Sequence, residues 1–140
     1  DVDFVTPEDR RRVTEALSEI GFMLNGRIYT NETTDYTVDI VGSTPYIEQR
    51  LIADFVTIQT DLGALRVISL EDAIADRVAH WLHWSDNEAL DIAQQTIEAT
   101  KDRLDAKKLR AAIHVLSRPD EATTARYDVA MRRITRALEA

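Results

Sequence analysis

The sequence contains no cysteine, which excludes disulfide bonds, thiolate nucleophiles and cysteine-ligated zinc sites. Glycine is scarce as well: four glycines stand far apart in the chain, at Gly21, Gly26, Gly42 and Gly63. The chain therefore has no glycine-rich phosphate loop of the Walker or dinucleotide-binding type. An absence of cysteine suits a cytoplasmic protein, and we expect that localisation.

Long apolar runs are also missing. No stretch approaches the roughly 20 consecutive apolar residues that a membrane-spanning helix needs, and no secretory signal peptide is visible. We therefore expect no membrane partner. Hydrophobic residues make up 44% and charged residues 30% of the 140 residues, as in an ordinary globular protein of one domain.

Positive charge is in deficit, because the formal net charge is −8. This balance argues against broad nucleic-acid binding, which depends on Lys and Arg neutralising phosphates. Two basic clusters could still guide an RNA end or could be solvated helix faces: Arg10 to Arg12, and Lys107 with Lys108 and Arg110.

Two short segments, Asp1–Val5 and Tyr36–Val41, are predicted to be β-strands because β-branched and aromatic residues dominate them. Residues two apart in a strand share a face, so Asp1 and Asp3 project together. If the second strand lies beside the first, Asp39 joins them on that face. Three neighbouring carboxylates repel one another, and divalent cations, most often Mg²⁺, compensate for this in sites of phosphoryl transfer. Taken singly, each aspartate could instead cap a turn or face solvent.

The order of these features resembles the core of the nucleotidyltransferase superfamily: an Asp-x-Asp strand, a helix, and an apolar-Asp-apolar strand. The later runs Ser69–Ala79 and Trp84–Asp91 are similar to the helical part of minimal bacterial nucleotidyltransferases of the abortive-infection AbiEii toxin type and their uncharacterised relatives. The similarity covers roughly residues 1 to 95. It implies that Asp1, Asp3 and Asp39 are the catalytic and metal-binding residues.

The resemblance also implies a reaction and partners. A nucleoside monophosphate would pass from an NTP to a protein or RNA hydroxyl with Mg²⁺, in a toxin–antitoxin context, with a cognate antitoxin or a homodimer as further partners. The superfamily places a Gly-Ser pair shortly before its Asp-x-Asp, whereas this sequence starts at Asp1 without Met. We therefore expect an excerpt or a processed product. The alternative is a catalytically inactive module of the same fold that binds or regulates.

Three further residues are nucleotide-binding candidates by the same resemblance. Arg77 matches a position where the family often carries Lys, directed at the nucleotide phosphates; Arg can bind phosphate bidentately, although its reach and geometry differ from those of Lys. Its alternative role is an ion pair on the helix surface with Asp76 or another nearby acid. Asp86 and Asp91 match a later acidic pair of the family, although Asp86 is also a favourable acid at a helix start.

His80 and His83 are spaced to share one helix face, with Trp81 and Trp84 beside them. No third ligand stands at a diagnostic spacing, so a metal site is disfavoured. We expect an aromatic face that packs on the sheet or on a partner, with hydrogen-bonded imidazoles. Stacking of a base on the indoles is the less favoured use.

The predicted fold is α+β: a small mixed sheet with one packed helix, followed by a C-terminal bundle of about four helices. We expect a single domain over residues 1–140, with a sheet half at 1–68 and a helical half at 69–140. Boundary predictions are a first helix starting at Thr6–Asp9, hairpins turning at Asn25–Gly26 and at Asp61–Gly63, and a loop over 42–49. The helices are predicted at 69–84, 86–103, 105–117 and 121–138.

A third hypothesis competes with the active and inactive nucleotidyltransferase folds. The chain could be a helical interaction domain in which the aspartate pattern is coincidental. That hypothesis predicts that Asp39 lies far from Asp1 and Asp3.

Overall fold

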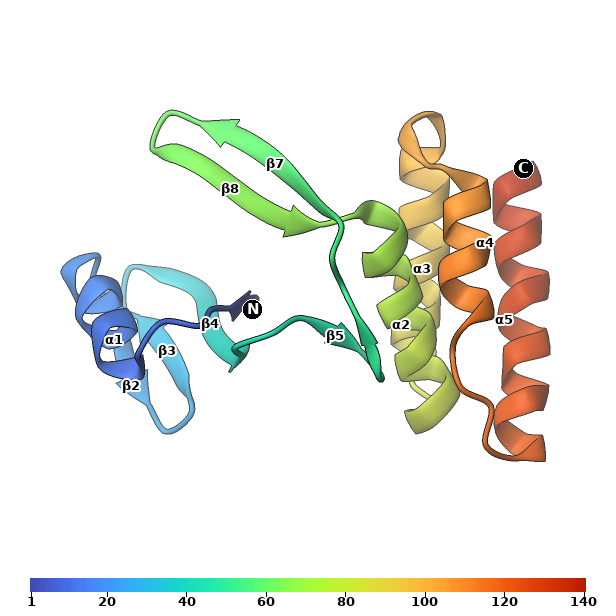
Figure 1. The fold of residues 1–140 in the computed structure, drawn as a ribbon, viewed down its shortest axis with the longest axis horizontal. Helices are drawn as coiled ribbons and strands as arrows, with labels where there is room; N and C mark the ends of the chain where they lie inside the picture. The colour runs from blue at the N-terminus through green and yellow to red at the C-terminus, as the bar shows by residue number, and fades with distance from the viewer. The chain divides into compact units, whose positions relative to one another are not determined.

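The computed structural model describes residues 1–140 and has the predicted α+β architecture, with a mixed sheet and C-terminal helices (Figure 1). The elements in chain order are β1 (Val2–Val5), α1 (Arg10–Glu19), β2 (Met23–Asn25), β3 (Ile28–Asn31), β4 (Thr34–Gly42), β5 (Tyr46–Ile47), β6 (Arg50–Leu51), β7 (Phe55–Thr60), β8 (Gly63–Ile68), α2 (Leu70–Trp84), α3 (Asn87–Thr100), a 3₁₀ turn (Lys101–Arg103), α4 (Ala106–His114) and α5 (Glu121–Glu139).

Internal contacts group the chain into two compact units, Asp1–Pro45 and Tyr46–Ala140, called here the N-terminal and C-terminal units. The boundary lies earlier than the change of sequence pattern at Ser69, because the chain between Tyr46 and Ile68 belongs with the helices. A single functional domain over residues 1–140 stays a prediction.

The N-terminal unit is built on a four-stranded sheet with the strand order β1-β4-β3-β2. β1 pairs with β4 in parallel, whereas β2, β3 and β4 pair as an antiparallel meander. A parallel pair needs a long crossover, and α1 together with the β2–β3 hairpin supplies it. The predicted turn is present: Asn25 pairs with Ile28 across a two-residue loop that begins at Gly26, whose φ is 66°.

Helix α1 begins later than the sequence predicts. Asp9, not Thr6, is the N-cap, because its carboxylate accepts the amide of Arg11 at 2.9 Å. Thr6 instead accepts the amide of Glu8 and closes a separate turn before the helix. The predicted stop at Gly21 is confirmed, since that residue has a φ of 85° and follows the helical C-cap.

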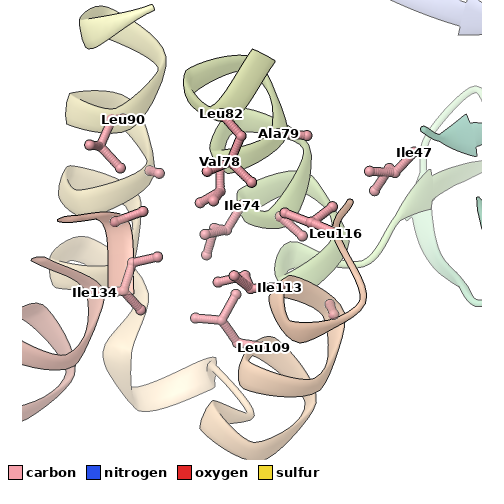
Figure 2. Packing of buried hydrophobic residues seen from close by; sticks show 14 of the residues in the cluster. Ile47, Ile74, Val78, Ala79, Leu82, Leu90, Leu109, Ile113, Leu116 and Ile134 are labelled. Carbon is pink, nitrogen blue, oxygen red and sulfur yellow. The ribbon is translucent and has the colours of Figure 1, made fainter. Parts of the chain in front are cut away.

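The C-terminal unit packs α2, α3, α4 and α5 around one apolar core, to which β5 adds Ile47 (Figure 2). Ser69, Asp86, Asp105 and Asp120 are the N-caps, so all four helices start within a residue or two of the predicted positions. Figure 2 shows side chains from α2, α3, α4 and α5 pointing toward one another; the labelled ones that are fully buried include Val78, Leu82, Leu109, Ile113 and Ile134.

Two small antiparallel ladders complete the C-terminal unit. The hairpin of β7 and β8 is confirmed, with Thr60 paired to Gly63 across the predicted turn. The prediction of a loop over 42–49 is wrong in its second half. β5 pairs with β6 there. Glu48 in the turn adopts a left-handed φ of 52°, a conformation that a glutamate in the sequence does not predict.

Candidate functional site

Asp3 and Asp39 lie side by side on neighbouring parallel strands, because β1 and β4 pair in a register that matches Asp3 with Asp39. Val38 and Ile40 line a groove together with residues of α1, so the alternation of β4 places Asp39 on the opposite face from that helix. Asp39 is 7% exposed, whereas Asp3 is exposed. The prediction that these two carboxylates meet on one face is therefore supported by the strand register.

The hypothesis of a coincidental aspartate pattern is weakened by this register, since Asp39 is the strand partner of Asp3. Asp1 precedes the first strand residue, Val2, and belongs to no cluster: no three His, Asp or Glu side chains lie close enough together to hold a metal ion. A third carboxylate from Asp1 therefore stays a prediction.

Arg27 is a residue of the site that sequence reasoning missed. Its guanidinium lies 3.1 Å from the Oδ2 atom of Asp39, and its side chain is 84% exposed. Arg27 follows Gly26 in the β2–β3 turn, so the predicted hairpin is the signal that could have placed a cation near the Asp39 strand. An exposed pair of this kind contributes little to stability, but it supplies positive charge beside a buried carboxylate.

The three nucleotide-binding candidates belong to the C-terminal unit. Arg77 lies 3.7 Å from Asp76, the surface pairing that was its alternative role. Asp86 caps α3 by accepting the amide of Ala89 at 3.1 Å, and Asp91 pairs with Arg133 of α5 at 2.6 Å. Each of the three thus has a neighbour in its own unit, and a role in nucleotide binding stays a prediction.

Asp72 is the best-connected buried acid of the molecule. Its carboxylate accepts the Ser69 hydroxyl at 3.0 Å and the Arg50 guanidinium at 2.6 Å, and its amide donates to the Ser69 Oγ. Ser69 and Asp72 thus form a modified capping box, because the acid binds the Ser69 hydroxyl and an arginine from β6 instead of the backbone amide of Ser69. These contacts tie β6 to the start of α2.

Glu71, also buried, accepts the amide of Asp105 at 2.9 Å and lies 4.0 Å from Lys108. Lys108 donates a 2.8 Å hydrogen bond to Asp54. That bond raises the pKa of Lys108 and lowers the pKa of Asp54, since each group stabilises the charged form of the other. Glu71 therefore links the start of α2 to the start of α4.

The histidine and tryptophan cluster at the end of α2 divides into packed and exposed members. Trp81 donates its indole N–H to the carbonyl of Arg126 at 3.0 Å, and His83 binds Glu48 through Nε2, as expected for packed side chains. Trp84 is 69% exposed, so the predicted aromatic face is packed only in part.

Ser117 completes a polar cluster with His83 and Glu48. The backbone amide of Ser117 donates to Glu48 at 2.9 Å, and its hydroxyl lies 3.5 Å from His83 Nε2. The Glu48 carboxylate and the Ser117 hydroxyl both contact Nε2 of His83, whereas in a catalytic triad the carboxylate and the hydroxyl bind opposite ring nitrogens. The cluster is therefore a link between the β5–β6 turn, α2 and the end of α4.

No protein-family model, curated protein or solved structure matches the chain. None of its helices combines the length and the apolar character that a bilayer crossing requires.

Proposed function

We propose that this chain is a nucleotidyltransferase-like protein that transfers a nucleoside monophosphate from an NTP to a protein or RNA hydroxyl and releases pyrophosphate. The observation that carries the proposal is the pairing of Asp3 with Asp39 on adjacent parallel strands. Two carboxylates on one sheet face are the minimal protein ligand set for a metal ion that carries a triphosphate. The toxin–antitoxin context is part of the same proposal and rests on the sequence resemblance alone.

The residues fit Mg²⁺ by their donor chemistry. Asp3 and Asp39 offer carboxylate oxygens, the hard ligands that Mg²⁺ prefers, and Mg²⁺ commonly takes one or two carboxylates and completes its coordination with waters and substrate phosphates. Two protein ligands are therefore enough, with Asp1 as the predicted third. When bound, the metal would supply charge neutralisation on the phosphates and lower the pKa of an attacking hydroxyl.

The protein residues have separate tasks in this proposal. Asp3 and Asp39 would hold the metal and thereby orient the triphosphate, and either carboxylate can accept the proton of the attacking hydroxyl. Arg27, which is free to move at the hairpin tip, turns from Asp39 toward a phosphate oxygen when the triphosphate arrives. A role of Arg77 in phosphate binding rests on the sequence resemblance alone.

A catalytically inactive module of the same fold is the second candidate. The observation that favours it is the ion pair of Asp39 with Arg27 at 3.1 Å, because an arginine can neutralise this carboxylate without a metal. Such a protein would keep the sheet and its carboxylates but would not bind nucleotide in a metal-dependent way.

The test is an isothermal titration of each NTP into the wild type and into three Asp→Asn variants, with and without Mg²⁺. Asp3→Asn and Asp39→Asn remove one charge from the site with little change of shape. Asp35→Asn is the matched control, since Asp35 is exposed and lies four residues before Asp39 on the same strand, β4.

We expect Mg²⁺-dependent binding that weakens at least about tenfold in Asp3→Asn and Asp39→Asn and persists in Asp35→Asn, because only the first two carboxylates are strand partners. Nucleotide binding that does not depend on Mg²⁺, or that is unchanged in both Asp3→Asn and Asp39→Asn, would contradict the proposed metal site. Folded wild type without affinity for any NTP would favour the inactive module.

A further inference from the structure

The outer edge of β1 carries no partner strand. β1 is the first strand in the order β1-β4-β3-β2 and pairs with β4 alone. Its apolar residues are incompletely covered, with exposed fractions of 40% for Val2, 39% for Phe4 and 38% for Val5. Proteins usually protect such an edge, because its free amides and carbonyls accept a further strand.

An apolar groove runs beside this edge, on the face covered by α1. Its volume is about 370 Å³, and its apolar lining comes from three elements: Phe4 of β1; Val13, Ala16 and Leu17 of α1; Val38 and Ile40 of β4. The polar residues at the groove include Glu8 and Arg12, which neutralise each other in a 2.7 Å ion pair. The groove thus offers apolar contact without net charge.

The other face of the same edge is acidic. Asp3 alternates with Val2 and Phe4 along β1, so its carboxylate lies on the face opposite the groove, beside Asp39. Arg27 pairs with Asp39, but no ion pair is formed by Asp3. A strand added outside β1 would therefore have one row of side chains over apolar atoms and the other row beside carboxylates.

We propose that the β1 edge binds an extended segment of a partner protein in which apolar residues alternate with Lys or Arg. The apolar side chains enter the groove beneath α1, and the basic side chains pair with Asp3 and its neighbours. Main-chain hydrogen bonds to β1 supply affinity and the alternating side chains supply specificity, as in other cases of strand addition.

Charge decides between this partner and other occupants. A second copy of the chain paired through β1 would bring two Asp3 carboxylates together, and each copy carries a net charge of −8. Like charges directly opposite each other destabilise a strand pair. Nucleic acid would meet the same repulsion from the carboxylates. A basic and apolar strand is the occupant that satisfies both faces.

This inference goes beyond the proposed function and has a consequence for it. The basic side chains of the added strand lie on the carboxylates that the proposed function assigns to the metal, so the partner competes with a Mg²⁺-nucleotide there. The edge and the groove do not depend on that assignment, and direct peptide binding separates failure of this inference from failure of the proposed function.

The test uses fluorescence anisotropy of labelled ten-residue peptides with the whole chain. The probe alternates Val with Lys; one control alternates Val with Glu, and another has the composition of the probe in two blocks. We expect the probe to bind at least about tenfold more tightly than either control, and to weaken as salt is raised. Equal binding of the Lys and Glu peptides would overturn the proposal.

Strand addition has a directional signature. A strand uses alternate amides at one edge only, so two versions of the probe, N-methylated on alternate residue sets, must differ: one binds and the other does not. Hydrogen exchange should show protection of β1 amides when the unmodified probe is added. Equal binding of the two methylated peptides, or no change in exchange at β1, would overturn strand pairing.

Variants locate the surface. Ala16→Gln puts a polar side chain into the groove at an exposed helix position, and Asp3→Asn removes charge from the other face; both should weaken the probe several-fold. Ser18→Gln, exposed on α1 and outside the groove, is the control that should bind normally. Unchanged binding in Ala16→Gln, or sedimentation showing a dimer that the probe does not dissociate, would overturn the assignment.

Discussion

The two units of this protein differ in how they are held together. The continuous apolar core, from Ile47 to Ala137, belongs entirely to the C-terminal unit, where helices contribute fully buried side chains. In the N-terminal unit only Tyr29 and Val38 are buried apolar residues, and α1 has no buried residue. A 2.8 Å hydrogen bond between the hydroxyls of Thr14 and Tyr29 helps to join that helix to the sheet. The candidate carboxylates therefore stand in the unit with the smaller core.

Two buried aspartates sharpen this contrast. Asp72 in the C-terminal unit and Asp39 in the N-terminal unit are 3% and 7% exposed, and each binds an arginine. The partner of Asp72, Arg50, is itself largely covered, with 34% of its side chain exposed, whereas Arg27 is 84% exposed. The covered partner and the hydroxyl bond of Asp72 are typical of a structural role, whereas water can compete for the exposed guanidinium that pairs with Asp39.

The largest expected effect is on the core. Leu82→Ala should lower the free energy of unfolding by about 2–5 kcal/mol, because Leu82 is fully buried among four helices. Leu17→Ala, at a partly exposed position of α1, should change the free energy of unfolding of the C-terminal unit by no more than about 0.5 kcal/mol.

Tryptophan fluorescence in urea measures this difference, because Trp81 and Trp84 both belong to the C-terminal unit. Circular dichroism of the two variants without urea is the control for folding. An equal shift of the tryptophan transition in both variants would show that the two units unfold as one, and the contrast between them would fail.

The next effect compares the two aspartates. Asp72→Asn should cost about 1–3 kcal/mol, since it leaves Arg50 without its anion at a partly covered site. Asp39→Asn should cost less than about 1 kcal/mol, because water can replace Asp39 around the exposed Arg27. The urea transition of each variant gives the values, and a larger cost for Asp39→Asn would assign that residue a structural role.

The smallest effect is a pH dependence at α5. Hydrogen bonds from the amide and hydroxyl of Thr123 lower the pKa of Asp120 from its ordinary value of 3.8. A lowered pKa means that the charged form stabilises the fold above pH 3.8, and that this contribution is lost as the pH falls through the folded-state value.

Asp120→Asn keeps the capping oxygen and removes the charge, so it isolates this effect. The wild type should melt slightly higher than the variant at pH 6, and the difference should shrink below pH 3.8. Melting temperatures of both proteins over pH 3 to 6 test it; a difference that grows toward acid would reverse the sign and refute the assignment.

The local signals predicted much of this fold. Ser69 and the three aspartate caps start their helices where expected, and Gly21 ends α1. The start of α1 was missed because Thr6 and Asp9 are both good caps, and the choice depends on which amide each side chain reaches. The β5–β6 ladder was missed because two-residue strands carry no periodicity.

The candidate site was predictable only in part. Alternation along a strand puts Asp39 opposite to its apolar neighbours whatever the partner strand is, so its face follows from the sequence. The pairing with Asp3 depends on register across the long crossover between Val5 and Thr34, and Arg27 reaches Asp39 from the β2–β3 turn. The pairing of Asp3 with Asp39 has no local signal, whereas the predicted hairpin at Asn25–Gly26 indicates only that Arg27 lies near the Asp39 strand.

By itself the sequence determined most of the element types, the starts of the four C-terminal helices and the face of β4 on which Asp39 lies, because these depend on neighbours within a few residues. Only the tertiary structure decided that β1 stands at an open edge, that Asp3 meets Asp39, and that Asp72 is bound by Arg50. Such contacts join residues that lie 22 or more positions apart, and their free energy comes from packing and pairing between elements.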